Sequence, residues 1–218
     1  MIPAVEHKKV EVQIDSTVLP GYLNVPYKAL GLILFSHGSG SSRNSPRNTY
    51  VASVLEKNGL ATFLFDLLTE KEDSTYETRF NIDLLTERLI KVTDWITLKP
   101  ELQKLPIGYF GASTGAASAL RAAAHFGDKV SAVVSRGGRP DMALSDLEKV
   151  TAPTLLLVGG WDHLVIELNR EAYLKLNCNR KLKVIPEATH LFEEPGKLEQ
   201  VALLSTKWFL KWFKNENV

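Results

Sequence analysis

The hydrophobic residues of the chain fall into short continuous runs separated by longer amphipathic segments. Six mostly apolar runs are found, at residues 30–38, 61–68, 105–113, 130–138, 153–160 and 181–189. Runs without polar alternation are typical of strands that are buried on both faces of a parallel sheet. Residues 8–25 differ, because apolar and polar positions alternate there and the chain turns at Pro20-Gly21. We therefore predict an antiparallel hairpin at the edge of this sheet.

Segments with helical periodicity lie between the predicted strands. One helix is expected to begin at Pro46 after the N-cap Ser45 and to end before Gly59. Others are predicted over residues 82–96, 116–126 and 198–213. The last of these carries four aromatic residues with lysines between them, and we expect it to cover the sheet rather than to lie on a membrane surface.

The alternation of strands and helices predicts one α/β domain over residues 1–218. We expect a doubly wound, mostly parallel sheet with the antiparallel N-terminal hairpin at its edge and helices on both faces. Between the runs that end at Ser135 and begin at Thr154, the chain has room for one short helix near residues 146–150. The sequence therefore predicts a fold without a cap domain.

Composition narrows the choice of partners and compartment. The chain has 26 Lys and Arg residues against 25 Asp and Glu residues, a formal net charge of +1, which is not the basic field that nucleic-acid binding needs. Its longest apolar stretches, such as residues 32–35, are too short to span a bilayer, and the N-terminus becomes charged before any apolar signal region. The single cysteine, Cys178, allows no internal disulfide and no multi-cysteine metal site. We expect a cytoplasmic protein without nucleic-acid or membrane partners.

A candidate nucleophile follows the third buried run. Gly111-Ala112-Ser113-Thr114-Gly115 has the G-x-S-x-G pattern between a predicted strand and a predicted helix. We expect the turn to be so tight that a Cβ on either glycine would collide, with Ser113 strained and its hydroxyl exposed. This setting favours a nucleophilic serine.

A base and an orienting acid follow later strands, in the chain order that such a serine requires. Asp162 follows the run at 153–160 and His190 lies at the end of the run at 181–189, so each is expected on a loop at the carboxyl edge of the sheet. His190 would take the serine proton, and Asp162 would hold the imidazole in the productive tautomer. Asp141, after the preceding strand, is the alternative acid.

Small residues follow the first buried run and supply a candidate oxyanion hole. We predict that the backbone N–H groups of Thr114 and Ser39 stabilise a tetrahedral intermediate, with Gly40 as the alternative to Ser39. The segment 37–42 lacks both the Gly-Lys-Ser/Thr ending of a P-loop and the G-x-G-x-x-G spacing, which argues against a nucleotide site.

These motifs, HGSGSS, GASTG, GGWD and ATHLF, give the chain its family resemblance. It resembles the α/β-hydrolase superfamily over nearly its whole length, and within it the small, lidless branch similar to dienelactone hydrolases. The resemblance implies the same roles for Ser113, Asp162 and His190. Dienelactone hydrolases proper carry cysteine as the nucleophile in the turn between this strand and helix, whereas this chain carries Ser113.

Taken together, these features predict a serine hydrolase that cleaves small carboxylic esters or lactones through an acyl-serine intermediate, without metal or other cofactor. An open site without a cap suits small-molecule substrates. Arg136 and Arg139 follow a strand and are candidates to bind an anionic substrate, the alternative being ordinary ion pairing. We expect a monomer or a small homo-oligomer.

Two other functions remain open at this point. The same residues would support acyl transfer to an acceptor other than water, such as peroxide. The chain would alternatively be a non-catalytic binding module that retains the fold, which the complete set of three candidate residues argues against.

Overall fold

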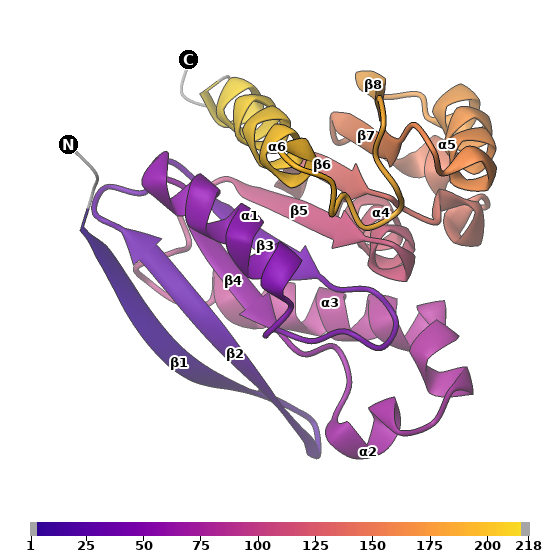
Figure 1. Cartoon of the computed structure of the whole chain (residues 1–218). Coiled ribbons are helices and arrows are strands. Elements are labelled where there is room, and N and C mark those ends of the chain that lie inside the picture. Colours follow the sequence, from indigo (N-terminus) through magenta and orange to yellow (C-terminus); the bar gives the residue numbers. More distant parts are fainter. Residues whose placement is uncertain (1–3, 215–218) are drawn as a thin grey trace.

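A computed structural model describes residues 4–214 of the chain. One eight-stranded sheet runs through the molecule (Figure 1). The strands stand in the order β1-β2-β4-β3-β5-β6-β7-β8. Their bounds are β1 Val5–Ile14, β2 Thr17–Pro26, β3 Leu32–Ser36, β4 Ala61–Phe65, β5 Ile107–Ala112, β6 Val130–Arg136, β7 Thr154–Gly159 and β8 Arg180–Ile185. Strands β3 to β8 are parallel, whereas β1 and β2 form an antiparallel hairpin that joins β4. This arrangement confirms the predicted fold class.

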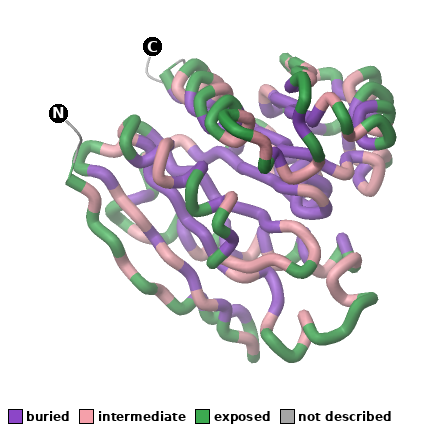
Figure 2. Tube along the Cα trace, in the orientation of Figure 1, coloured by how far each residue is buried: buried purple, intermediate pink, exposed green. Residues whose placement is uncertain are grey.

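Burial of the strands follows from their position in the sheet. Strands β3 to β7 are buried along their whole length, as expected for strands covered on both faces (Figure 2). The prediction of two buried faces was wrong for β8, where Lys181 and Lys183 are exposed. This strand is the last in the sheet, and charged side chains on an edge strand oppose pairing with other chains.

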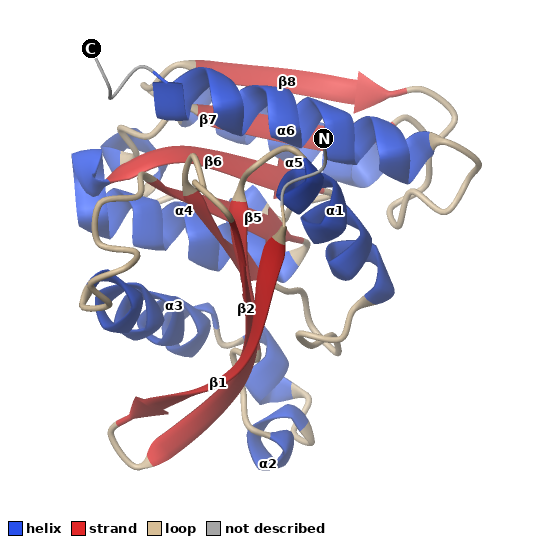
Figure 3. Cartoon of the chain, turned by 90° about the vertical axis from the view of Figure 1, so that its left-hand side faces the viewer, coloured by secondary structure: helices blue, strands red, loops and turns tan. Residues whose placement is uncertain are grey.

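Helices cover both faces of the sheet (Figure 3). One face carries α1 and α6, and the other carries α3, α4 and α5. The bounds are α1 Pro46–Lys57, α2 Glu70–Asp73, α3 Ile82–Thr97, α4 Thr114–Phe126, α5 His163–Lys175 and α6 Lys197–Lys214, with short 3-10 turns at Glu77–Phe80, Gly127–Lys129, Pro140–Ala143 and Leu147–Lys149. Ser45 caps α1 as predicted, since its side chain accepts a hydrogen bond from the Asn48 N–H.

Helix α6 packs on the sheet, as its aromatic pattern predicted. Phe209 and Phe213 are fully buried, and they lie so close to the strands that a Cβ on Gly108 would stand 2.7 Å from the Phe209 ring. Lys211 lies over the ring of Trp212, 4.6 Å from its centroid, so its stem covers apolar surface while its charge reaches water. None of the helices within residues 4–214 is long and apolar enough to cross a membrane.

The connection between β6 and β7 contains only two 3-10 turns, so the part of the chain that the structure describes has no separate cap domain. The segment between β4 and α3 has more structure than the hydrophobic pattern indicated, because it folds into α2 and a 3-10 turn, Glu77–Phe80. A capping box formed by Thr69 and Glu72 begins α2. This spacing of Thr and Glu is a signal in the sequence that would have revealed the helix.

Candidate active site

Ser113 occupies a sharp turn between β5 and α4. Its backbone has φ 52° and ψ −123°, a conformation that is strained for a residue with a Cβ. An added Cβ on Gly111 would lie 2.5 Å from the Cα of Ala116, and one on Gly115 would lie 2.1 Å from the carbonyl oxygen of Ser36. The predicted strain at Ser113 and the predicted collisions at both glycines are therefore confirmed.

Asp162 and His190 meet at the carboxyl edge of the sheet. Asp162 lies between β7 and α5, His190 lies on the loop after β8, and Nδ1 of the imidazole is 2.6 Å from Asp162 Oδ2. Backbone bonds hold the two loops together, because the Trp161 N–H donates to the Ala188 carbonyl oxygen at 2.9 Å. With Nδ1–H donated to the carboxylate, Nε2 is left as the proton acceptor of the ring.

Contacts with two glycines place Ser113 and His190 at the same edge. A Cβ added to Gly38 would lie 3.7 Å from Ser113 Oγ, and one added to Gly137 would lie 3.4 Å from His190 Nδ1. The Ser113 N–H donates to the carbonyl oxygen of Arg136, the residue before Gly137. No hydrogen bond joins Ser113 Oγ to His190 among the described residues; such bonds are often long in enzymes without substrate.

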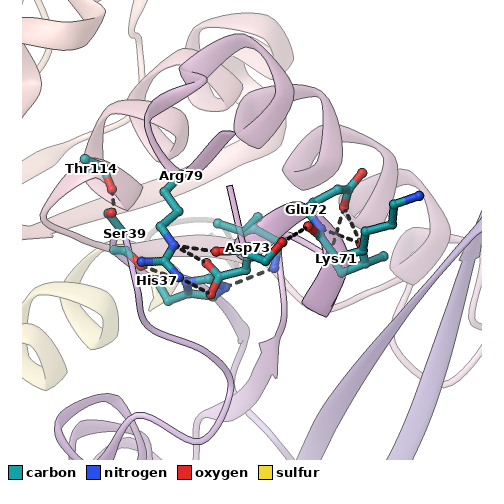
Figure 4. A network of polar contacts seen from close by, with 11 residues as sticks. His37, Ser39, Lys71, Glu72, Asp73, Arg79 and Thr114 are labelled. Atoms are coloured by element: carbon teal, nitrogen blue, oxygen red, sulfur yellow. Dashed lines mark hydrogen bonds and ion pairs between the residues drawn. The ribbon is translucent and has the colours of Figure 1, made fainter. Parts of the chain in front are cut away.

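The two predicted oxyanion donors lie side by side. The Ser39 N–H donates to the side-chain oxygen of Thr114 at 2.9 Å (Figure 4). This bond joins the loop after β3 to the first residue of α4, immediately after Ser113. The structure thus brings Ser39 and Thr114 together next to the candidate nucleophile, and the Thr114 hydroxyl is the acceptor of the Ser39 N–H.

His37 anchors the start of this loop and was not among the predicted site residues. Its Nε2 accepts a hydrogen bond from the Leu67 N–H at 3.0 Å, so Nδ1 carries the proton and donates to the Gly38 carbonyl oxygen at 3.0 Å. Burial holds the pKa of His37 below its usual value because the charged form is poorly solvated. The neutral ring therefore ties the loop after β3 to the chain beyond β4.

Arg79 reaches the same loop from the segment between β4 and α3. Its guanidinium is held by Asp73, through the backbone oxygen at 2.6 Å and the carboxylate at 3.2 Å (Figure 4). A Cβ on Gly40 would lie 3.7 Å from Arg79 Nη1. Sequence reasoning missed Arg79 because no motif surrounds it, and its position depends on how α2 folds back.

Asp141, the alternative acid, is engaged elsewhere. Arg139 donates to both of its carboxylate oxygens, at 2.9 and 2.8 Å. This ion pair raises the pKa of Arg139 through its hydrogen bonds with the carboxylate. Asp162, and not Asp141, is the carboxylate that contacts His190.

Arg136 lies at the end of β6 and is buried, with 5% of its surface exposed. Its Nη2 donates to Asn48 Oδ1 at 3.3 Å, and burial together with the nearby charge of Arg47 lowers its pKa to about 10. Within residues 4–214, no group of three or more His, Cys, Asp or Glu side chains is arranged to hold a metal ion.

Comparison with known proteins agrees with this architecture. Residues 31–153 match the model of the alpha/beta hydrolase fold family. This chain belongs to the α/β-hydrolase family. Within that family it falls in the dienelactone hydrolase-like branch, because it is 52% identical to the dienelactone hydrolase of Anabaena variabilis, with a TM-score of 0.93 over 95% of this chain and 98% of that one.

Two further similarities concern the fold and the length of the chain. A lidless α/β serine hydrolase from Xanthomonas campestris superposes with a TM-score of 0.78 at 18% identity, over 95% of each chain, and this likeness concerns the fold alone. Proteins of Mycobacterium tuberculosis provisionally named phosphoribosyl transferases are 53% identical over 208 residues. This chain spans about half the length of those relatives, since the match covers 95% of it and 47% of theirs.

Proposed function

We propose that the chain is a serine hydrolase of small carboxylic esters or lactones, with Ser113 as nucleophile, His190 as base and Asp162 as orienting acid. The observation that carries this proposal is the 2.6 Å hydrogen bond between His190 Nδ1 and Asp162, at the sheet edge where Ser113 occupies its strained turn. The chemistry needs a nucleophile, a base and a group that orients the base, and these are the residues that supply them.

The reaction begins when Ser113 Oγ attacks the acyl carbon of the substrate. Nε2 of His190 takes the hydroxyl proton, and Asp162 stabilises the resulting imidazolium without accepting its proton. Collapse of the tetrahedral intermediate releases the alcohol, which receives the proton from His190 and leaves an acyl group on Ser113. A water molecule, deprotonated by His190, then attacks the acyl-enzyme, and Ser113 leaves with the returned proton.

The N–H groups of Thr114 and Ser39 are the proposed donors to the oxyanion. Because the Ser39 N–H donates to Thr114 Oγ1 in the free enzyme, binding of the oxyanion exchanges one oxygen acceptor for another. Such an exchange favours the transition state, since the oxyanion carries more charge than a hydroxyl oxygen and so accepts a stronger hydrogen bond.

Substrate size is proposed from the lack of a cap over the described part of the chain, which leaves long acyl chains without apolar walls. Arg136 and Arg139 keep their proposed role toward an anionic substrate, although Arg139 already pairs with Asp141. The transferase function named for the mycobacterial relatives applies to proteins about twice as long, and acyl-serine chemistry is what the residues of this chain support.

Replacement of Ser113 tests the proposal. Ser113→Ala should lower ester hydrolysis by about 10³-fold or more and should abolish labelling by a fluorophosphonate probe, while the variant unfolds cooperatively. Ser53→Ala is the matched control, because Ser53 lies on α1 and its hydroxyl donates to the Tyr50 carbonyl oxygen, away from the candidate site. Hydrolysis by folded Ser113→Ala within about tenfold of wild type would refute the mechanism. Product ratios with and without added peroxide distinguish hydrolysis from acyl transfer.

A further inference from the structure

Arg136 is a buried cation without an acidic partner. It is 5% exposed, and no carboxylate in the part of the chain that the structure describes forms an ion pair with it. Burying a guanidinium costs several kcal/mol unless an anion and hydrogen-bond acceptors replace the lost water. Two other arginines that follow strands of the sheet, Arg43 and Arg139, do have carboxylate partners, Asp66 and Asp141.

The hydrogen bonds of Arg136 leave one nitrogen of its guanidinium buried and unpaired among the described residues. Its one side-chain hydrogen bond is the 3.3 Å contact from Nη2 to Asn48 Oδ1, and its Nε is buried with no partner among the described residues. Asn48 is itself 2% exposed. A neutral amide oxygen therefore stands where a buried arginine ordinarily meets a carboxylate.

The start of α1 adds positive potential at the same place. Arg47 and Asn48 lie in the first turn of this twelve-residue helix, and that first turn contains no acidic residue. The N-terminus of a helix attracts anions because its first N–H groups and its dipole point outward. The Nε of Arg47 is also buried with no partner within residues 4–214, and Arg47 is close enough to lower the pKa of Arg136.

Three carboxylates, those of Glu193, Glu194 and Glu199, line a surface hollow beside Arg47, and none of them forms an ion pair with Arg136 in the described part of the chain. Glu193 accepts from Arg47 Nη1 at 3.2 Å, but its side chain is 63% exposed. An ion pair of this exposure is screened by water and contributes little. The buried Nε groups of Arg47 and Arg136 therefore have no anionic partner among the residues that the structure describes.

We propose that Arg136, Arg47 and Asn48 form a binding site for a small oxyanion of carboxylate or phosphate type. Planar guanidinium groups match such oxygens in geometry and charge, and a site out of water strengthens each bond. Two neighbouring arginines that repel one another become mutually compatible once an anion lies between them.

The site adjoins the catalytic residues through the backbone. The carbonyl oxygen of Arg136 accepts the Ser113 N–H, and Gly137 lies against the ring of His190. The anion has two possible sources, an acidic group of the substrate or a free anion from solution. The first source rests on the proposed function, whereas binding of a free anion does not.

Thermal unfolding of the whole chain tests binding directly. Inorganic phosphate and acetate are titrated at constant ionic strength, with a bulky organic sulfonate as the balancing anion. The melting temperature of the wild type should rise with the logarithm of the anion concentration above Kd, because the anion binds the folded state. Arg47→Gln, a substitution near the surface, should weaken anion binding and so raise the apparent Kd by about tenfold or more.

Two further variants make the result decisive. Arg136→Met replaces the buried cation with an apolar side chain of similar length, and it should melt cooperatively without any response to the anions. Arg170→Gln is the matched control, since Arg170 is an exposed arginine paired with Glu167, and it should respond as the wild type does. Equal responses of wild type, Arg47→Gln and Arg136→Met, or no response in the wild type, would overturn the proposal.

Kinetics with a matched pair of esters, one neutral and one bearing a carboxylate, then identifies the source of the anion. Competition by phosphate against the acidic ester alone places the substrate's anionic group in the site. Equal effects of phosphate on both esters indicate a free anion from solution. If the wild type hydrolyses neither ester, the proposed function fails, and the melting experiment still decides whether the anion site exists.

Discussion

Replacing Asp162 with asparagine isolates the hydrogen bond on which the proposed mechanism depends. The substitution keeps the size of the side chain and removes its charge. In the structure, Asp162 Oδ2 lies 2.6 Å from His190 Nδ1, and the carboxylate is 16% exposed whereas the imidazole is 37% exposed. The bond is therefore partly shielded from water, and it is charge-assisted because its acceptor is a carboxylate.

Two losses follow from the change. A hydrogen bond to a charged group contributes about 1.5–3 kcal/mol, which corresponds to roughly 10–150-fold in rate, and the exposure of His190 favours the lower part of that range. An asparagine that turns its NH2 group toward Nδ1 also stabilises the tautomer with the proton on Nε2, which cannot accept a proton from Ser113. We expect kcat for a short ester to fall by about 10²–10⁴-fold at neutral pH.

Asp141→Asn is the matched control for this experiment. Asp141 binds Arg139, and the carboxylate that accepts from His190 is that of Asp162, so replacing Asp141 should change kcat by less than about tenfold. Hydrolysis of p-nitrophenyl acetate is followed for both variants, and circular dichroism verifies that each is folded. A larger loss in Asp141→Asn than in Asp162→Asn would refute the assignment of the acid.

Three other predictions concern the turn at Ser113, His37 in the loop after β3, and the substrate. Gly115→Ala places a Cβ 2.1 Å from the Ser36 carbonyl oxygen and should destabilise the fold by about 3 kcal/mol or more in urea unfolding. Gly127→Ala, which meets no atom within 4 Å, should cost only about 1–2 kcal/mol for its positive φ, and equal losses would contradict the steric argument. Burial lowers the pKa of His37 below 6.5, so the folded state binds fewer protons there than the unfolded state, and the contribution of His37 to stability is complete above about pH 6.5 and declines as the pH falls toward the folded pKa. In urea unfolding, the free energy of unfolding of His37→Gln should therefore fall less steeply with decreasing pH than that of the wild type, and parallel pH curves for the two proteins would count against this. Hydrolysis of p-nitrophenyl esters should be fastest for short acyl chains and fall steeply by about eight carbons, and a maximum at twelve carbons would contradict the open site.

The local pattern of the chain was sufficient for the sheet and for the three residues of the proposed mechanism. Continuous apolar runs predicted the central strands because a strand covered on both faces has no polar side to reveal. Ser113, Asp162 and His190 were found because parallel strands end at one edge, so residues that follow different strands converge there. The prediction that both faces are buried was wrong for β8, because its exposed lysines belong to an edge strand, and a short apolar run does not distinguish an edge strand from a central one.

The surroundings of the site depend on contacts between distant segments. His37 binds the backbone at Leu67, Arg79 approaches Gly40, and the Ser39 N–H meets the side chain of Thr114, each across 30 residues or more. Charge partners were equally hidden, because the sequence presents Arg136 and Arg139 as equivalent while the fold pairs one with Asp141 and buries the other. The sequence alone determined which strands form and where the candidate catalytic residues follow them, since those depend on local periodicity and on the direction of the strands. Only the tertiary structure decided which charges are paired, buried or free, because hydrogen bonds and desolvation depend on the neighbours that folding brings together.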